Sequence, residues 1–305
     1  MNKKTTIVYS GIILATCFWG LSYVWFKMLN EYYRPLTIIF LRLTLSSIFL
    51  LVFAKMVNRL QKIDKKDRKF VLLLAFFSPF LYFIGESFGL TFVHSTTAAV
   101  IVSTIPVFIP FAAHYFLREK LSLLNYLGLS ISFFGVLIII INKDYHLEAS
   151  LAGILILLLA VFSGVAYSIL LKKMTSNYNA ISLITYQNIA GIVYFLPLFL
   201  FFDFNRFIQV PLTADVVIPV IELAIFASSF AFIFFAIGIR ELGATKASIF
   251  SNLVPIFTAI FAFLLLNESL TLRKIIGIII VITGVFLSQY RSKFLKQTLD
   301  RSVRQ

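Results

Sequence analysis

Two stretches of this chain, STIPVFIPFAAHYFLREKLS at residues 103–122 and NLVPIFTAIFAFLLLNESLT at residues 252–271, repeat one unusual pattern. Each places proline inside an apolar run and has a glutamate close to its end. They align without a gap at a constant offset of 149 residues. That offset pairs Pro106 with Pro255, Glu119 with Glu268, Gly128 with Gly277 and Gly135 with Gly284. Shared apolar residues carry little weight in so apolar a chain, but shared Pro, Glu and Gly residues indicate that one unit occurs twice.

The composition indicates a membrane protein. Hydrophobic residues make up 60% of the 305 residues and charged residues 13%, with a mean hydropathy of +0.96. A soluble domain is roughly half apolar and a quarter charged. The apolar residues recur in runs of about 20, the length that an α-helix needs to cross about 30 Å of hydrocarbon. We therefore predict an all-α polytopic membrane protein with ten spans, at residues 7–27, 35–54, 70–91, 95–117, 123–141, 151–171, 180–202, 214–238, 244–266 and 272–290.

The positive charge follows the predicted topology. The net charge is +14, and 20 of the 27 Lys and Arg residues fall on the side of the membrane that holds both termini. Seven of them lie in the polar connector 55–69. Cytoplasmic loops of membrane proteins carry such an excess, so we expect both termini in the cytoplasm. We expect the protein to lie in a bacterial inner membrane. We therefore expect membrane lipids to surround the chain. The cytoplasmic excess of Lys and Arg explains the net charge, so we expect no nucleic-acid partner.

Five spans per unit have a topological consequence. Because five is odd, the second unit must enter the membrane from the side opposite to the first. We predict one repeat at 1–145, an inverted second repeat at 146–290 and a basic cytoplasmic tail at 291–305. Inverted repeats recur in transporters, where exchange of conformations between the halves alternates access to a central site.

The repeated motif resembles a known family. In the first half it consists of Gly89-Leu90, Ala98, Pro106, Arg118-Glu119, Gly128 and Gly135, and in the second of Gly238-Ile239, Ala247, Pro255, Asn267-Glu268, Gly277 and Gly284. This pattern is similar to the EamA domain of the drug/metabolite transporter superfamily, over about residues 7–290. The resemblance implies a ten-helix basket around a central cavity that moves small organic metabolites or drugs, often outward.

Ionisable side chains inside spans are the first site candidates, because each costs about 2.5–3.5 kcal/mol at the bilayer centre. Arg42, Glu86 and Glu222 fall in the outer halves of their predicted spans. We expect Arg42 to hold a substrate carboxylate, or to pair with Glu86 or Glu222 as a gate or proton-sensitive switch. A static interhelical ion pair is the alternative. In the resembled family an arginine at this place in span two is frequent, which supports Arg42 as a site residue.

Aromatic and polar residues of repeat-related helices complete the predicted substrate site. Trp19 and Tyr23 share a helix face, and we expect them to cover the apolar part of a solute. We expect Tyr82, Tyr167 and Tyr186 to line the cavity as well, where they can stack on a flat or cationic solute. Helix packing or lipid contact is the alternative for any single ring. Three polar residues are added by their place in the repeat: Gln187, which aligns with Arg42, and Ser103 and Asn252, which each precede a span proline by three residues.

Other repeated residues suggest structural roles. Glu119 and Glu268 precede the expected N-caps Ser122 and Thr271, where a carboxylate favours the positive end of the next helix. The glycines at 128, 135, 277 and 284 are spaced for close helix packing.

The sequence lacks the motifs of an enzyme or a pump driven by ATP. It has no glycine-rich phosphate loop, one cysteine and three scattered histidines, so we expect no cofactor and no metal. We therefore predict a secondary transporter of small amphipathic, amino-acid-like solutes, with protons as a coupling ion. The alternatives are a nucleotide-sugar or lipid-carrier permease of the same superfamily, a non-transporting membrane scaffold or sensor, and a membrane enzyme.

Overall fold

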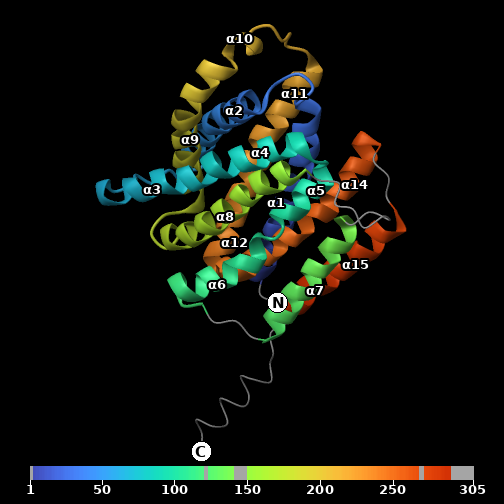
Figure 1. The fold of residues 1–305 in the computed structure, drawn as a ribbon. Helices are drawn as coiled ribbons and strands as arrows, with labels where there is room; N and C mark the ends of the chain where they lie inside the picture. The colour runs from blue at the N-terminus through green and yellow to red at the C-terminus, as the bar shows by residue number, and fades with distance from the viewer. Residues whose placement is uncertain (1–2, 120–122, 141–149, 268–270, 290–305) are drawn as a thin grey trace, which may run out of the picture.

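The computed structural model describes residues 3–119, 123–140, 150–267 and 271–289, in which helices are joined by turns and there is no β-strand. Four sequence predictions fall outside the described residues: the N-cap at Ser122, the role of Glu268, the repeat boundary at 145/146 and the tail 291–305. The described helices pack into one bundle (Figure 1).

The helices follow the apolar runs. The first half contains α1 (Lys3–Leu29), α2 (Pro35–Met56), η1 (Lys65–Asp67), α3 (Arg68–Ala75), η2 (Phe76–Leu81), α4 (Tyr82–Phe92), α5 (Ser95–Val102), α6 (Ile105–Leu117) and α7 (Leu123–Ile140). The second contains α8 (Leu151–Met174), α9 (Ala180–Phe202), α10 (Phe204–Phe207), α11 (Ala214–Glu222), η3 (Leu223–Phe230), α12 (Ala231–Leu242), α13 (Ala244–Ile249), η4 (Phe250–Leu253), α14 (Val254–Leu266) and α15 (Leu272–Gln289).

Seven helical stretches within the described residues are long and apolar enough to cross a membrane, which makes this a multi-pass membrane protein. Three further apolar helices, Ile105–Leu117, Leu123–Gly135 and Ile275–Leu287, are shorter. The predicted span 95–117 is divided into α5 and α6. The number of ten crossings therefore stays a prediction.

Prolines cause the division of span 95–117. Pro106 lies in the first turn of α6, and α5 ends four residues earlier at Val102. Proline lacks an N–H group and its ring clashes with the carbonyl four residues before it, so the helix is interrupted there. Pro255 has the same place in α14, where the chain passes through the 3₁₀ turn η4 instead. Both interruptions expose backbone and side-chain polar groups to the interior of the bundle.

The third span of each half is irregular at the same place in the repeat. The irregular segments are η2 in the first half, which is kinked by the non-helical backbone of Ser78 (φ −144°, ψ 123°), and the π-helical η3 in the second. An offset of 149 residues brings them into register at their C-terminal ends. π-helical turns are rare and frequently occur at functional sites. Both η2 and η3 face the centre of the bundle, where they contribute to the site described below.

Equivalent helices of the two halves pack against each other in antiparallel pairs. The α7 and α15 helices lie side by side (Figure 1). A Cβ added to Gly135 would lie 2.7 Å from the backbone nitrogen of Val281 and 2.9 Å from the carbonyl oxygen of Gly277. A Cβ added to Gly284 would meet the backbone of Ser132 and the carbonyl of Gly128 in the same way. The predicted close packing through these glycines is therefore present, and it is reciprocal.

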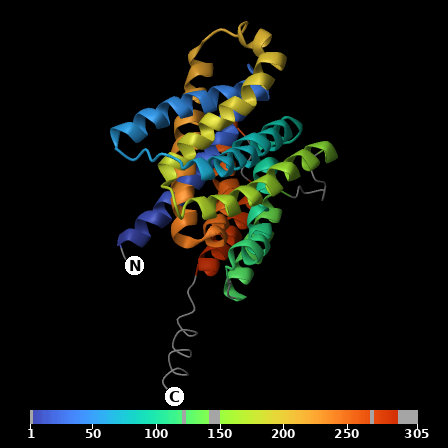
Figure 2. The same cartoon turned by 90° about the vertical axis from the view of Figure 1, so that its left-hand side faces the viewer.

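The α2 and α9 helices form the second such pair (Figure 2). At one end, the backbone N–H and hydroxyl of Thr37 both donate to Asp203 Oδ2 at 3.1 Å. At the other end, the hydroxyl of Ser182 donates to the carbonyl of Arg59 at 3.0 Å and accepts from the N–H of Gln61 at 2.7 Å. Thr37 and Ser182 are equivalent at the offset of 145 residues that also relates Arg42 to Gln187. The pair is therefore held at both ends by equivalent positions.

Two further helix contacts join the halves, and they are equivalent to each other under the repeat. The α4 helix packs on α8, and α12 packs on α1, which is the same contact with the halves interchanged. Glycines permit the close approach in both cases, since a Cβ at Gly85 would meet the backbone of Ala160 and one at Gly238 would meet the side chain of Ile12.

Glu119 forms a contact that the sequence did not predict. Its carboxylate accepts hydrogen bonds from the backbone N–H groups of Ala244 (2.9 Å) and Thr245 (3.2 Å). These belong to the first turn of α13 in the other half. The carboxylate lies against Gly243, whose φ of +93° suits glycine. Glu119 therefore joins the two halves at this end of the bundle, because the left-handed backbone of Arg118 directs the chain out of α6 and toward α13.

The glycine crossings generate a stability test. We expect Gly135→Ala to lower the free energy of unfolding by about 1–3 kcal/mol, because the added methyl group meets backbone that cannot move aside. Gly11→Ala is the matched control, since its Cβ would find its nearest neighbour at 3.7 Å, and alanine favours the helix by up to about 1 kcal/mol. Unfolding of the detergent-solubilised protein measures both, and equal stability of the two variants would contradict the packing described.

The Glu119 contact generates a second stability test. We expect Glu119→Ala to lower the free energy of unfolding by about 1–2 kcal/mol, because two N–H groups at the start of α13 lose their acceptor. Glu119→Gln keeps one acceptor oxygen and should retain part of the stability. Glu31→Ala, at an exposed position, controls for loss of a carboxylate elsewhere. The same melting assay compares the three, and a loss in Glu31→Ala as large as that in Glu119→Ala would rule out the proposed cap.

Candidate functional site

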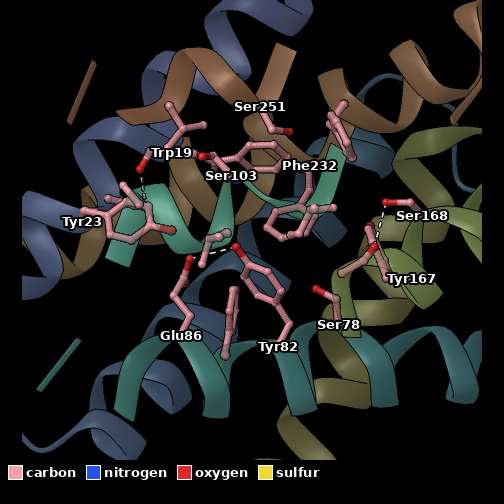
Figure 3. A pocket seen from close by; sticks show the side chains of 18 of the residues that line it. Trp19, Tyr23, Ser78, Tyr82, Glu86, Ser103, Tyr167, Ser168, Phe232 and Ser251 are labelled. Carbon is pink, nitrogen blue, oxygen red and sulfur yellow. Dashed lines mark hydrogen bonds between the residues drawn. The ribbon is translucent and has the colours of Figure 1, made fainter. Parts of the chain in front are cut away.

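A cavity of about 70 Å³ lies at the centre of the bundle (Figure 3). Its wall is built by both halves, through α1, α2, η2, α4, α5 and α6 from the first and α8, α12, η4 and α14 from the second. Paired glycines bring these helices together. A Cβ on Gly20 would lie 2.5 Å from the Cβ of Phe257, and one on its repeat equivalent Gly164 would lie 2.6 Å from the Cδ1 of Ile105.

The cavity has one charged end. Arg42, on α2, is 2% exposed, and its Nε donates to the hydroxyl of Ser228 in η3 at 2.7 Å. The guanidinium carbon lies 4.3 Å from the centroid of the Phe83 ring, which stabilises the cation through its π face. Glu86, on α4, is 8% exposed and accepts a hydrogen bond from the Tyr82 hydroxyl at 2.9 Å. Tyr82 and Glu86 are four residues apart and share one face of the helix.

Arg42 and Glu86 act on each other electrostatically, but none of the ion pairs within 4 Å in the described chain joins them. The Tyr23 hydroxyl lies beside Glu86 and Tyr82, although it forms no hydrogen bond of good geometry with any described residue. The guanidinium of Arg42 and the carboxylate of Glu86 therefore form no direct ion pair at the cavity wall, and each is stabilised by its own neighbours, Ser228 and Phe83 for Arg42 and Tyr82 for Glu86. Separated charges of this kind can each bind a charged group of opposite sign.

The Arg42 support is part of a larger polar network between α2, η3 and α9. The amide of Asn188 donates to the hydroxyl of Ser46 at 2.8 Å and to the carbonyl of Ser228 at 3.0 Å. Ser46 and Ser229 share a hydrogen bond of 2.7 Å. These bonds occupy backbone and side-chain groups at the π-helical segment. This network was not predicted from the sequence, although the serine pairs 46–47 and 228–229 inside apolar spans indicate buried polar groups that need hydrogen-bond partners.

Aromatic rings form the apolar part of the wall. Trp19 makes edge-to-face contacts with Phe232 and Phe235, at centroid distances of 5.4 and 5.0 Å. Phe232 also contacts the rings of Phe83 (6.3 Å) and Tyr167 (6.1 Å). Phe232 therefore lies at the centre of the aromatic surface. Neither it nor Phe235 was predicted, since nothing in the sequence distinguishes them among 35 phenylalanines.

Seven of the ten predicted site residues lie on the cavity wall: Trp19, Tyr23, Arg42, Tyr82, Glu86, Ser103 and Tyr167. The structure thus brings together residues from four helices, α1, α2, α4 and α8, and from the turn between α5 and α6. Their role in binding a substrate remains a proposal.

Three predicted residues lie elsewhere. Gln187 is fully buried beside Tyr167. Asn252 is buried and donates to the hydroxyl of Ser132 on α7 at 2.7 Å, while its neighbour Ser251 lines the cavity. The tighter winding of η4, with three residues per turn, places Ser251 rather than Asn252 toward the cavity.

Glu222 does not form the predicted contact with Arg42. The groups that act electrostatically on Arg42 are Glu86, Tyr82 and Tyr23. Arg42 reaches the third span of the second half at Ser228, six residues beyond Glu222, which is about 9 Å along a helix. Glu222 is half-buried at the end of α11, away from the cavity. Within the described chain, no three His, Cys, Asp or Glu side chains come together as metal ligands.

Comparison with known proteins agrees with this architecture. The family model described as EamA-like transporter family matches residues 6–141 and 151–290, one copy in each half. An uncharacterized transporter of Archaeoglobus fulgidus is 26% identical over 277 residues, which are 90% of this chain and 96% of that protein. The uncharacterized transporter YoaV of Bacillus subtilis is 25% identical, over 93% of this chain and 97% of its own.

A solved crystal structure shares the fold. Its TM-score is 0.77 at 13% sequence identity, and the match covers 98% of this chain and 100% of that chain. The two matched copies of the family model show that the chain belongs to the EamA-like transporter family.

Proposed function

We propose that this protein is a secondary active transporter of small amphipathic metabolites, amino-acid-like in chemistry, that works by alternating access around the central cavity. The observation that carries the proposal is the pair of separated charges, Arg42 and Glu86, on the wall of a cavity that both halves build. Arg42 binds a carboxylate of the solute, and the rings of Trp19 and Tyr23 cover its apolar part. Glu86 is placed to take an ammonium group or a coupling proton.

The alternating mechanism draws support from the packing of equivalent helices. The α7–α15 and α2–α9 pairs run antiparallel, and the α4–α8 and α12–α1 contacts exchange the halves. Two five-helix repeats inserted in opposite senses would produce these contacts. In this mechanism the Glu119 contact with α13 closes one side of the cavity and breaks when that side opens.

The alternatives fit the cavity less well. A nucleotide-sugar or lipid-carrier permease has to compensate a diphosphate, and Arg42 is the one Lys or Arg side chain among the described lining residues. A scaffold or sensor has no need of buried, separated charges, each of which costs free energy in a bilayer. We propose no catalytic activity, no bound cofactor and no nucleic-acid partner.

We place both termini in the cytoplasm and the protein in the cell membrane. The support is the Lys and Arg excess of the predicted cytoplasmic side. The connector 55–69 on that side lies against the α8–α9 loop, where the side chain of Asn179 donates to the Arg59 carbonyl at 2.7 Å. Flux out of the cell and coupling to protons are part of the proposal.

Solvent access to the cavity can be tested by cysteine modification in a Cys17→Ser background. We expect Ser251→Cys, on the cavity wall, to react with a water-soluble methanethiosulfonate reagent in detergent-solubilised protein. Ser229→Cys is the control, because Ser229 is buried, hydrogen-bonded to Ser46 and off the wall. Mass spectrometry measures both, and an unreactive Ser251→Cys in folded protein would mean that no aqueous path reaches the cavity.

The role of Arg42 can be tested with amino acids and their amides, which lack the carboxylate. We expect wild-type protein in liposomes to exchange amino acids at least tenfold better than the amides, since a hydrogen bond to a charged group contributes about 1.5–3 kcal/mol. Arg42→Ala should remove this preference and Arg42→Lys should keep part of it. Arg34→Ala, which removes a half-exposed arginine outside the cavity, is the control. Counterflow that never occurs with any amino acid would contradict transport of this class of solute.

A further inference from the structure

The end of the cavity opposite to Glu86 is uncharged. Figure 3 shows Tyr23 and Glu86 at one side of the cavity and Tyr167, Ser168 and Ser78 at the other. No charged residue of the described chain acts electrostatically on the Tyr167 hydroxyl, and the side chain of Gln187 lies beside it. The two charged groups on the described wall, Arg42 and Glu86, both belong to the Tyr23 side.

Three polar atoms at this uncharged end form no hydrogen bond of good geometry within the described chain. They are the Tyr167 hydroxyl and both the Oε1 and Nε2 atoms of Gln187, although the two side chains lie close enough for a weak hydrogen bond to each other. Tyr167 is 4% exposed and lines the cavity, and Gln187 lies behind it with no exposed surface. More than nine in ten buried polar groups in proteins are paired. A buried group without a well-formed hydrogen bond is costly, so the Tyr167 hydroxyl on the cavity wall, backed by Gln187, indicates a place where another molecule supplies a hydrogen bond.

The repeat relates the residues of the two ends, although Arg42 lines the cavity wall and Gln187 lies behind Tyr167. Tyr167 is equivalent to Tyr23, and Gln187 is equivalent to Arg42. Arg42 faces η3 through Ser228, and Gln187 lies one turn from Gly191, whose Cβ position is packed against Pro79 of η2. The same two positions therefore form a phenol with a cation at one end and a phenol with a carboxamide at the other.

We propose that Tyr167 and Gln187 form a second substrate subsite that selects solutes with an uncharged hydrogen-bonding group, a hydroxyl or a carboxamide, at the end remote from the carboxylate. The unpaired atoms comprise donors and acceptors, which a hydroxyl or carboxamide can both satisfy. An apolar group there would leave the Tyr167 hydroxyl without a well-formed hydrogen bond, and an ion would find no counter-charge. This inference rests on the proposed function, because it takes the carboxylate of the solute to lie at Arg42.

Two pairs of amino acids that differ in a polar group test the subsite, one pair isosteric and one pair of similar side-chain length. L-threonine is compared with L-valine, and L-glutamine with L-norleucine, by their affinities in thermal-shift titrations of the detergent-solubilised protein. We expect wild type to bind the polar member of each pair about tenfold or more tightly, because sites built for a hydrogen bond discriminate strongly against analogues that lack it. Tyr167→Phe and Gln187→Leu should reduce this ratio toward one and leave the affinity for valine and norleucine unchanged.

The control is Tyr23→Phe, the same change at the equivalent position of the charged end, which should alter both members of a pair alike. A wild-type ratio near one, or an equal loss for both members in Tyr167→Phe, would overturn the subsite. If that happens while Arg42→Ala still weakens binding of all four amino acids, the proposed function stands and this inference alone fails. If none of the four binds wild-type protein, both are wrong.

The melting temperature without solute supplies an independent reading. Tyr167→Phe removes an unpaired buried hydroxyl, so we expect a melting temperature equal to or above that of wild type. Tyr178→Phe is the matched control, because its hydroxyl donates to Asp67 at 2.7 Å, and it should lower the melting temperature. A Tyr167→Phe protein destabilised as much as Tyr178→Phe would indicate a structural role for the hydroxyl and overturn the proposal.

Discussion

Close backbone contact between the antiparallel helices α7 and α15 is the constraint from which the rest of the arrangement follows. A carbonyl of each helix lies where a glycine of the other leaves room for it, so the two backbones approach at two reciprocal points. The α2–α9 pair repeats the antiparallel relation and is held at both ends by Thr37 and Ser182. With these pairs in place, α4 must pack on α8 and α12 on α1. The cavity is the space that these contacts leave between the halves.

Arg42 and Glu86 can stay charged at the cavity wall because neighbouring groups stabilise each of them. Desolvation of a guanidinium is expensive, and at Arg42 it is offset by the Ser228 hydroxyl, the face of Phe83 and the nearby field of Glu86. The π-helical turn of η3 brings Ser228 to Arg42 and Ser229 to Ser46. Irregular helical geometry thus occurs where buried polar groups need partners, and the regular helices around it present apolar surface to lipid.

The sequence predicted much of this arrangement because rare residues carry strong information in an apolar chain. The 149-residue offset identified the repeat and its glycine contacts, and the scarcity of ions inside spans identified Arg42 and Glu86. Phe232 could not be predicted, since its place depends on packing rather than on residue type. Asn252 was predicted to line the cavity, but Ser251 lines it instead, because the 3₁₀ turn η4 shifts by one position the residue that faces the cavity. The contact of Glu119 with α13 was not predicted, since short-range reasoning considers the helix next in the chain.

The equivalence of Arg42 and Gln187 has a consequence for why the two units are joined in one chain. An isologous homodimer of a five-helix unit would have to present either two arginines or two glutamines to its shared centre, because every position occurs twice. Covalent fusion removes that restriction, since each copy can diverge while the backbone crossings that hold the copies together stay the same. One cavity can then be ionic at one end and neutral at the other, and so distinguish the head of a solute from its tail.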